Sequence, residues 1–184
     1  MVSFLKAKAS DFDAYPSVST GALKRPRGLS LMGGVPVAGR LPSDLVFQVS
    51  DGSAVAGLTD FMTGVGVFVV SDALKDIVSR FTSTVEFIPV GIEYDGTLRS
   101  GYSIFNPVLL VDGVDLSASS LKLNSVGLAV SVERLVLNEQ RFAGVHVGLV
   151  HEVRQIAVSR ELGDAIMAAG CTGCRLVVPQ DFRL

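Results

Sequence analysis

The sequence predicts an α+β fold in which mostly antiparallel or mixed strands carry two similar strand–helix–strand units. Three observations lead to this prediction. Short apolar runs with alternating polarity recur along the 184-residue chain, a pattern typical of strands. Two segments, at residues 71–81 and 159–170, instead repeat apolar side chains at helical spacing. Asp-Gly pairs follow several of the strands and mark tight turns.

The N-terminal part of the chain combines a strand with a long irregular segment. We expect "MVSFLKAK" to form the first strand. Residues 9–43 are rich in Gly, Pro and Ser, so we expect an irregular excursion that lies on the core. Its apolar contacts would come from Leu29, Leu31, Met32, Val35 and Val37. "SVSTG" within it reads as a polar loop, "DLVFQVSDG" predicts a strand, and "GLTDFMTG" reads as a connector.

The first strand–helix–strand unit is predicted over residues 66–92. "VGVFVVS" is a buried strand, and "SDALKDIVSRF" is a helix with Ser71 as N-cap and Asp72 in its first turn. "STVEFIPVGIEY" then forms a strand, and the Asp95-Gly96 pair turns the chain into the return strand "SGYSIFNPVLLV".

The second unit is predicted over residues 155–179. "VGLAVSV", "RLVLN" and "GVHVGLVHEV" read as strands before it, and the unit itself contains the strand "QIAVS", the helix "SRELGDAIMAAG" and the strand "CRLVVPQDF". "VSDALKDI" and "VSRELGDA" share residue types at matching offsets. Both a duplicated unit and convergent helix capping explain this likeness. We expect one domain over residues 1–184.

Composition limits the function classes. The net charge of −2 provides no field that would attract nucleic acid or an anionic membrane, and the short basic cluster "LKRPRG" reads as a solvated loop. The two cysteines do not form the framework of a secreted scaffold, and the N-terminus lacks the apolar run of a signal peptide. We therefore expect a cytoplasmic protein; the sequence does not indicate its oligomeric state.

The only two cysteines and the only two histidines raise the hypothesis of a zinc site. Cys171 and Cys174 have the spacing of a metal knuckle, and His146 and His151 complete four ligands. The histidines, however, are five residues apart in a strand-like segment, which places them on opposite faces. The alternative is structural: Gly170 ends the helix, Cys171 covers the last turn near Ile166, and Cys174 enters the core.

Other candidate residues favour turns over chemistry. Asp112 and Asp115 could form an acid–base pair or a metal loop, but the full calcium-loop pattern is missing and an Asp-Gly turn with local capping explains both. The sequence contains neither a nucleophile elbow nor a phosphate-binding loop that opens a helix. We therefore expect a protein that is not an enzyme and that has no metal ion or other cofactor.

The order of the motifs over residues 58–178 resembles one known family. "GVFVVSDALKDIV", "VEFIPVGI", "YSIFNPVLLVDGVDLSAS" and "IAVSRELGDAIMAAGCTGCRL" follow one another as in myxobacterial-type immunity proteins of polymorphic-toxin systems, a family long known only as a domain of unknown function. The main matching positions are Ser71, Asp72, Phe87, Pro89, Tyr102, Asn106, Asp112, Asp115, Ser159, Gly170 and Gly173. The chain departs from the family pattern at Cys171 and Cys174, where the family has apolar residues, and at "VHVGL".

The resemblance implies a protein that neutralises a toxin by binding it, with the cognate toxin domain as partner. It supplies no catalytic residues, and the matching positions read as caps, turns and core strands. The toxin-binding surface would lie on loops that the motifs do not mark, so the resemblance assigns no residues to it. A small zinc-binding protein or a structural assembly component is the alternative.

Overall fold

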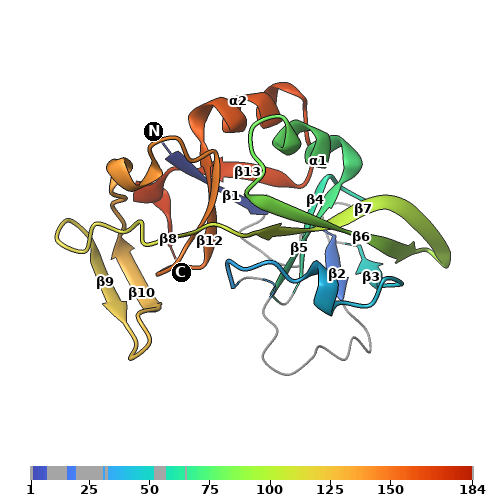
Figure 1. Ribbon diagram of the computed structural model, residues 1–184, viewed down its shortest axis with the longest axis horizontal. Helices are drawn as coiled ribbons and strands as arrows, with labels where there is room; N and C mark the ends of the chain where they lie inside the picture. The colour runs from blue at the N-terminus through green and yellow to red at the C-terminus, as the bar shows by residue number, and fades with distance from the viewer. Residues whose placement is uncertain are drawn as a thin grey trace.

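The computed structural model describes residues 2–7, 16–19, 31, 33–51, 57–64 and 66–183. The predicted α+β class is confirmed: strands predominate, and the two predicted helices, α1 (Asp72–Ser79) and α2 (Arg160–Ala168), are both present. The strands form a closed barrel, a five-stranded sheet and a separate two-stranded hairpin (Figure 1).

The barrel has the strand order β2-β3-β6-β7-β5-β4. Its strands are β2 (Ser17–Ser19), β3 (Val46–Ser50), β4 (Phe61–Gly64), β5 (Val67–Ser71), β6 (Val85–Tyr94) and β7 (Thr97–Pro107). A parallel pairing of Ser17 with Thr63 closes it. Closure removes the free sheet edges that an open sheet would expose. The barrel interior holds an apolar cluster that includes Phe47, Val69 and Ile104.

The five-stranded sheet has the order β13-β1-β12-β11-β8. Its strands are β1 (Val2–Ala7), β8 (Leu110–Val111), β11 (Val147–Val150), β12 (Gln155–Ser159) and β13 (Cys174–Val177). The pairings are antiparallel except that of β8 with β11. The hairpin of β9 (Ser120–Leu123) and β10 (Ala129–Arg134) projects from this half of the molecule (Figure 1).

The two helices lie side by side where the barrel meets the five-stranded sheet (Figure 1). Leu74 and Val78 of α1 and Leu162 and Ile166 of α2 are buried in one cluster, which also takes side chains from both sheets. A third cluster packs the five-stranded sheet against the base of the hairpin. The part of the chain that the structure describes also contains three short 3₁₀ turns: η1 (Ala38–Arg40), η2 (Glu139–Phe142) and η3 (Pro179–Asp181).

The two strand–helix–strand units have the same topology. In β5–α1–β6, the two strands are parallel and flank β7, which is antiparallel to both. In β12–α2–β13, the two strands are again parallel and flank one antiparallel strand, here β1. Each unit is therefore a split β-α-β motif with the inserted strand coming from another part of the chain. Duplication of one unit stays a prediction, with convergent helix capping as the alternative explanation of the likeness.

Several local predictions are wrong. The "connector" at residues 57–64 contains β4, because Phe61 and Met62 pair with Val70 and Val69. The predicted polar loop contains β2. Residues 135–138, all described, form only one isolated bridge, between Leu137 and Val114, and β9 was not predicted. The closed barrel was also not predicted from the sequence.

The excursion at residues 9–43 is described only in part. Leu31 and Val37 are buried, as predicted, but Val35 is 49% exposed, so the prediction for that residue is wrong. Leu29 and Met32 lie outside the described residues.

Candidate functional site

A hydrogen-bonded clamp at Asp60 joins the barrel to the five-stranded half. The Asp60 carboxylate accepts the Ser71 hydroxyl at 2.6 Å and both the backbone N–H and the hydroxyl of Thr172, at 2.7 and 2.8 Å. The Asp60 N–H donates in return to Thr172 Oγ1. Ser71 also caps α1, accepting the Leu74 N–H, and Thr172 lies between α2 and β13. One carboxylate therefore fixes a barrel hairpin, the start of α1 and the loop after α2.

The charge state of Asp60 follows from these contacts. Partial burial alone would raise the pKa of this carboxyl, but the hydrogen bonds from Ser71 and Thr172 outweigh burial and hold the pKa below the ordinary aspartate value. Asp60 is therefore ionised at neutral pH, which strengthens each of the hydrogen bonds it accepts.

The "GCTGC" segment fits tightly against this clamp. Gly170 has φ +70°, and the Cys171 N–H reaches back to the Ile166 carbonyl, which is the helix termination predicted for this segment. Gly173 has φ +77°, and a Cβ there would collide with the Phe61 carbonyl and with Thr59. The first glycine ends a helix in open space, whereas the second lets the loop touch the barrel.

A second anchor holds residues 35–38 on the barrel. Glu86 in β6 accepts the backbone N–H groups of Val37 and Ala38 at 2.7 and 3.0 Å. The buried Asn106 amide in β7 donates to Glu86 and to the Val35 carbonyl. Burial acts to raise the pKa of Glu86, but these hydrogen bonds prevail and lower it. The motif residue Asn106 thus serves to fix a segment distant in the sequence.

The remaining motif residues of the C-terminal half also make local contacts. Asp115 accepts the Ser117 hydroxyl and the backbone N–H groups of Ser117 and Ala118, and these contacts lower its pKa, with the Ser117 hydroxyl as the main cause. This is the turn capping that the sequence indicated. Asp112 Oδ1 lies 3.1 Å from His151 Nδ1. In β6, Phe87 packs edge-on against Phe105.

The four side chains of the zinc hypothesis make separate contacts. His146 Nδ1 lies 2.9 Å from the hydroxyl of Ser159, the α2 N-cap, and the His146 ring packs on Phe81; His151 faces Asp112 as described above. Within the described residues, no three His, Cys, Asp or Glu side chains are grouped closely enough to hold a metal ion. Cys171 and Cys174 are not joined by a disulfide. Burial, with the nearby charge of Asp60, raises the pKa of the Cys171 thiol.

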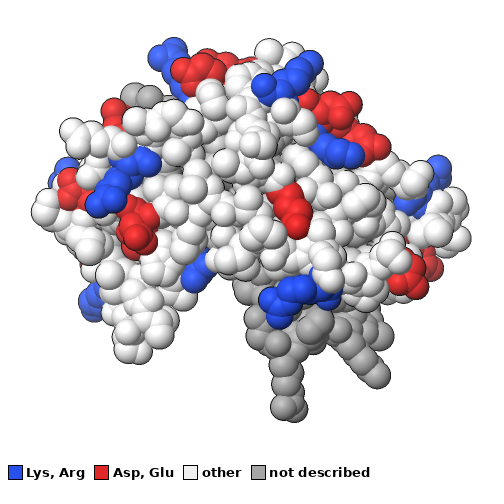
Figure 2. Space-filling view, in the orientation of Figure 1, with Lys and Arg blue, Asp and Glu red and all other residues white. Residues whose placement is uncertain are grey.

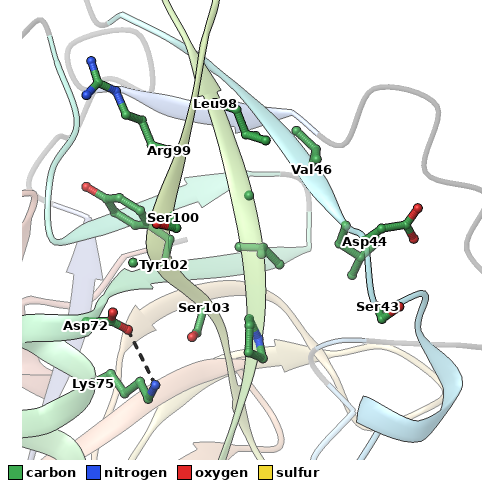
Figure 3. Close-up of a pocket in the computed structure, with 15 residues that line it drawn as sticks. Ser43, Asp44, Val46, Asp72, Lys75, Leu98, Arg99, Ser100, Tyr102 and Ser103 are labelled. Carbon is green, nitrogen blue, oxygen red and sulfur yellow. Dashed lines mark ion pairs between the residues drawn. The ribbon is translucent and has the colours of Figure 1, made fainter.

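An open cleft of about 750 Å³ lies on the outer face of the barrel beside the start of α1. Residues 43–46, 89–91 and 98–103 line it together with Asp72 and Lys75. It gathers three of the motif residues, Asp72, Pro89 and Tyr102, which are far apart in the sequence. In Figure 3, the Asp72–Lys75 ion pair of 3.5 Å stands at one border and Asp44 at the other.

Irregular pairing of β6 with β7 shapes the cleft. Val90 is opposite Tyr102 and Ile92 is opposite Arg99, so β7 carries one extra residue at this point. Gly101, within this bulge, has φ +88°, a conformation that favours glycine. A bulge bends the strand that carries it, and a Cβ on Gly101 would lie 3.5 Å from the Asp72 carboxylate, so the bulge lies beside the first turn of α1.

Sequence reasoning missed two residues that organise this region. Asp60 lies in a segment that was predicted to be a connector. Glu86 lies in a predicted strand, and the sequence pattern there does not indicate which residues its carboxylate binds. Glu86 binds Asn106, 20 positions away, and Asp60 binds Thr172, 112 positions away; periodicity carries no information about such contacts.

None of the helices that the structure describes is long and apolar enough to cross a bilayer. The family model described as Immunity protein family (Imm11) matches residues 6–181, nearly the whole chain. A comparison with the curated proteins found no match.

Proposed function

Because the chain belongs to the Immunity protein family (Imm11), we propose that it neutralises one cognate polymorphic toxin by binding the toxin domain stoichiometrically. The match over residues 6–181 is the observation that carries this proposal. The protein acts in the cytoplasm, where it meets the toxin, and it catalyses no reaction. Inhibition comes from occupying or distorting the toxin's active site.

The structure supports a binding role. The motif residues Ser71, Asn106 and Asp115 make hydrogen bonds within a helix cap, an anchored loop segment and a turn, which supports a structural role for them and leaves toxin contact to other residues. The open cleft on the barrel supplies an exposed surface with apolar and charged side chains. A toxin–inhibitor contact requires such a surface on a rigid frame, since preorganisation reduces the cost of binding.

Co-expression tests the proposal. The toxin domain encoded beside this chain is expressed in bacteria from an inducible promoter, with or without this protein. We expect growth only when the protein is present, and a 1:1 complex of the two purified proteins by light scattering after gel filtration. The proposal fails if the protein neither protects cells nor forms a complex with that toxin. Cell fractionation would test the cytoplasmic location.

A further inference from the structure

We infer that the barrel cleft receives a segment of the cognate toxin that presents one apolar side chain flanked by lysine or arginine. The inference rests on the proposed function and adds the place and the chemistry of the contact. Its evidence is the apolar floor of the cleft, the paired strands beneath it and the charges around it.

The floor of the cleft exposes two aliphatic side chains that touch the same glycine. A Cβ on Gly91 would lie 2.9 Å from Leu98 Cδ1 and 3.3 Å from Val46 Cγ2, so both side chains cover that backbone. Leu98 is nonetheless 65% exposed and Val46 41% exposed. Together they form an aliphatic surface that a partner's side chain can cover, and burial of such a central apolar contact dominates many protein interfaces.

Paired strands lie beneath this surface. Val46 of β3 pairs with Gly91 of β6, and β6 pairs with β7 in turn. A partner that lies across Val46, Gly91 and Leu98 therefore contacts side chains above a hydrogen-bonded sheet, and charge and shape are decisive for such a contact.

Of the four charged side chains that line the cleft, Asp44 and Asp72 are acidic and Lys75 and Arg99 are basic. Glu93 lies outside this lining but pairs with Leu98, which lines it. Figure 2 shows acidic and basic groups next to each other over α1 and near the tip of the β6–β7 hairpin. Lys75 is engaged with Asp72, and in Figure 3 Arg99 points away from Val46 and Leu98.

Glu93 lies beside the exposed aliphatic side chains of the cleft. It is directly opposite Leu98 in the β6–β7 pairing, which puts the two side chains on one face of the sheet. Asp44 stands beyond Val46 at the border of the cleft. A partner side chain covering Leu98 therefore meets carboxylates on both sides, and cationic neighbours complement them.

The open form of the cleft favours a protein segment over a small molecule. A small-molecule site encloses most of its ligand's surface, whereas this cleft opens broadly to solvent between α1 and the β6–β7 hairpin. Another exposed apolar surface is the tip of the β9–β10 hairpin, with Val126 66% and Val130 61% exposed. That tip carries no charge between residues 123 and 132, so it lacks the complementarity that the cleft offers and supplies a matched comparison.

The experiment measures the affinity of an inactivated form of the toxin domain encoded beside this chain for four variants. Leu98→Ala removes the apolar contact, and Glu93→Lys reverses a flanking charge. Val126→Ala and Glu139→Lys are the matched controls, since Val126 is as exposed as Leu98 and Glu139 is an exposed acid in η2. All four substituted residues are exposed, so circular dichroism is expected to show unchanged folding.

We expect Leu98→Ala to weaken binding by about 30-fold, mainly through faster dissociation. Glu93→Lys should slow association by about tenfold and make it less dependent on salt. Both controls should bind like the parent protein. If the parent protein does not bind this toxin, the proposed function fails. If it binds and the two cleft variants bind equally well, or only Val126→Ala weakens binding, the inference about the cleft is overturned.

Discussion

Replacing Asp60 with alanine should test the clamp between the two halves of the molecule. The substitution removes the acceptor of the Ser71 hydroxyl and of the Thr172 N–H and hydroxyl. A hydrogen bond to a charged group contributes about 1.5–3 kcal/mol when buried, and Asp60 is only half-buried, so about 1 kcal/mol for each contact is appropriate. We expect the free energy of unfolding to fall by about 3 kcal/mol, which corresponds to a loss of about 6–12 °C in Tm.

Urea unfolding followed by far-ultraviolet circular dichroism measures this change, because the chain contains no tryptophan to report by fluorescence. Thr172→Val alone and together with Asp60→Ala completes a double-mutant cycle, in which we expect a coupling of at least about 1 kcal/mol. Asp164→Ala is the control, since Asp164 is an exposed acid in α2 that pairs only with Arg160; it should cost about 0.5 kcal/mol or less. Additive effects of the two clamp substitutions would refute the reasoning.

The clamp also predicts a pH dependence. The pKa of Asp60 is lower in the folded chain than in the unfolded chain, so the unfolded chain binds more protons between the two values. Stability from Asp60 is therefore fully present above the ordinary aspartate pKa and is lost as the pH falls through the lowered, folded value. Asp60→Asn should flatten this part of the acid unfolding curve, and an unchanged curve would contradict the assignment.

Four further predictions concern Gly173, the two cysteines and Asn106. Gly173→Ala should lower the free energy of unfolding by about 3 kcal/mol or more, because the new Cβ would collide with the barrel backbone. Gly170 has a similar φ but open space around it, so Gly170→Ala should lower it by only about 1 kcal/mol. Equal losses in the two variants would contradict the close approach of Gly173 to the barrel. The pair Cys171→Ala and Cys174→Val should preserve folding and toxin protection, and stoichiometric zinc in the parent protein, lost in the variant, would contradict this. The raised thiol pKa of Cys171 should make its reaction with Ellman's reagent slow at pH 7. Asn106→Asp should lower the urea midpoint strongly at pH 7 and less at pH 5, because it places a buried carboxylate beside the β6 glutamate; a pH-independent loss would contradict the contact.

The elements that could be predicted from the sequence are those specified by residues close together in the chain. Ser71 and Ser159 cap the two helices, and side-chain periodicity identified both helices and most long strands. It failed at β4, where Thr63 and Gly64 weaken the strand pattern and pairing with β5 supplies the stability. The closed barrel could not be predicted, since it depends on distant pairings such as that of Val46 with Gly91. The Asp60–Thr172 contact spans 112 positions and left no local trace.

The frame and the proposed binding surface meet at the first turn of α1. Ser71 belongs to the clamp through Asp60, and Asp72, the next residue, borders the cleft. The clamp therefore fixes one border of the cleft, so that its rigidity serves binding as well as stability. Leu98 and Val46, in contrast, are exposed and lie outside the matched motif positions. Substitutions at such positions alter stability little. Partner choice can therefore change at residues 46 and 98 while the hydrogen-bonded frame behind them stays intact.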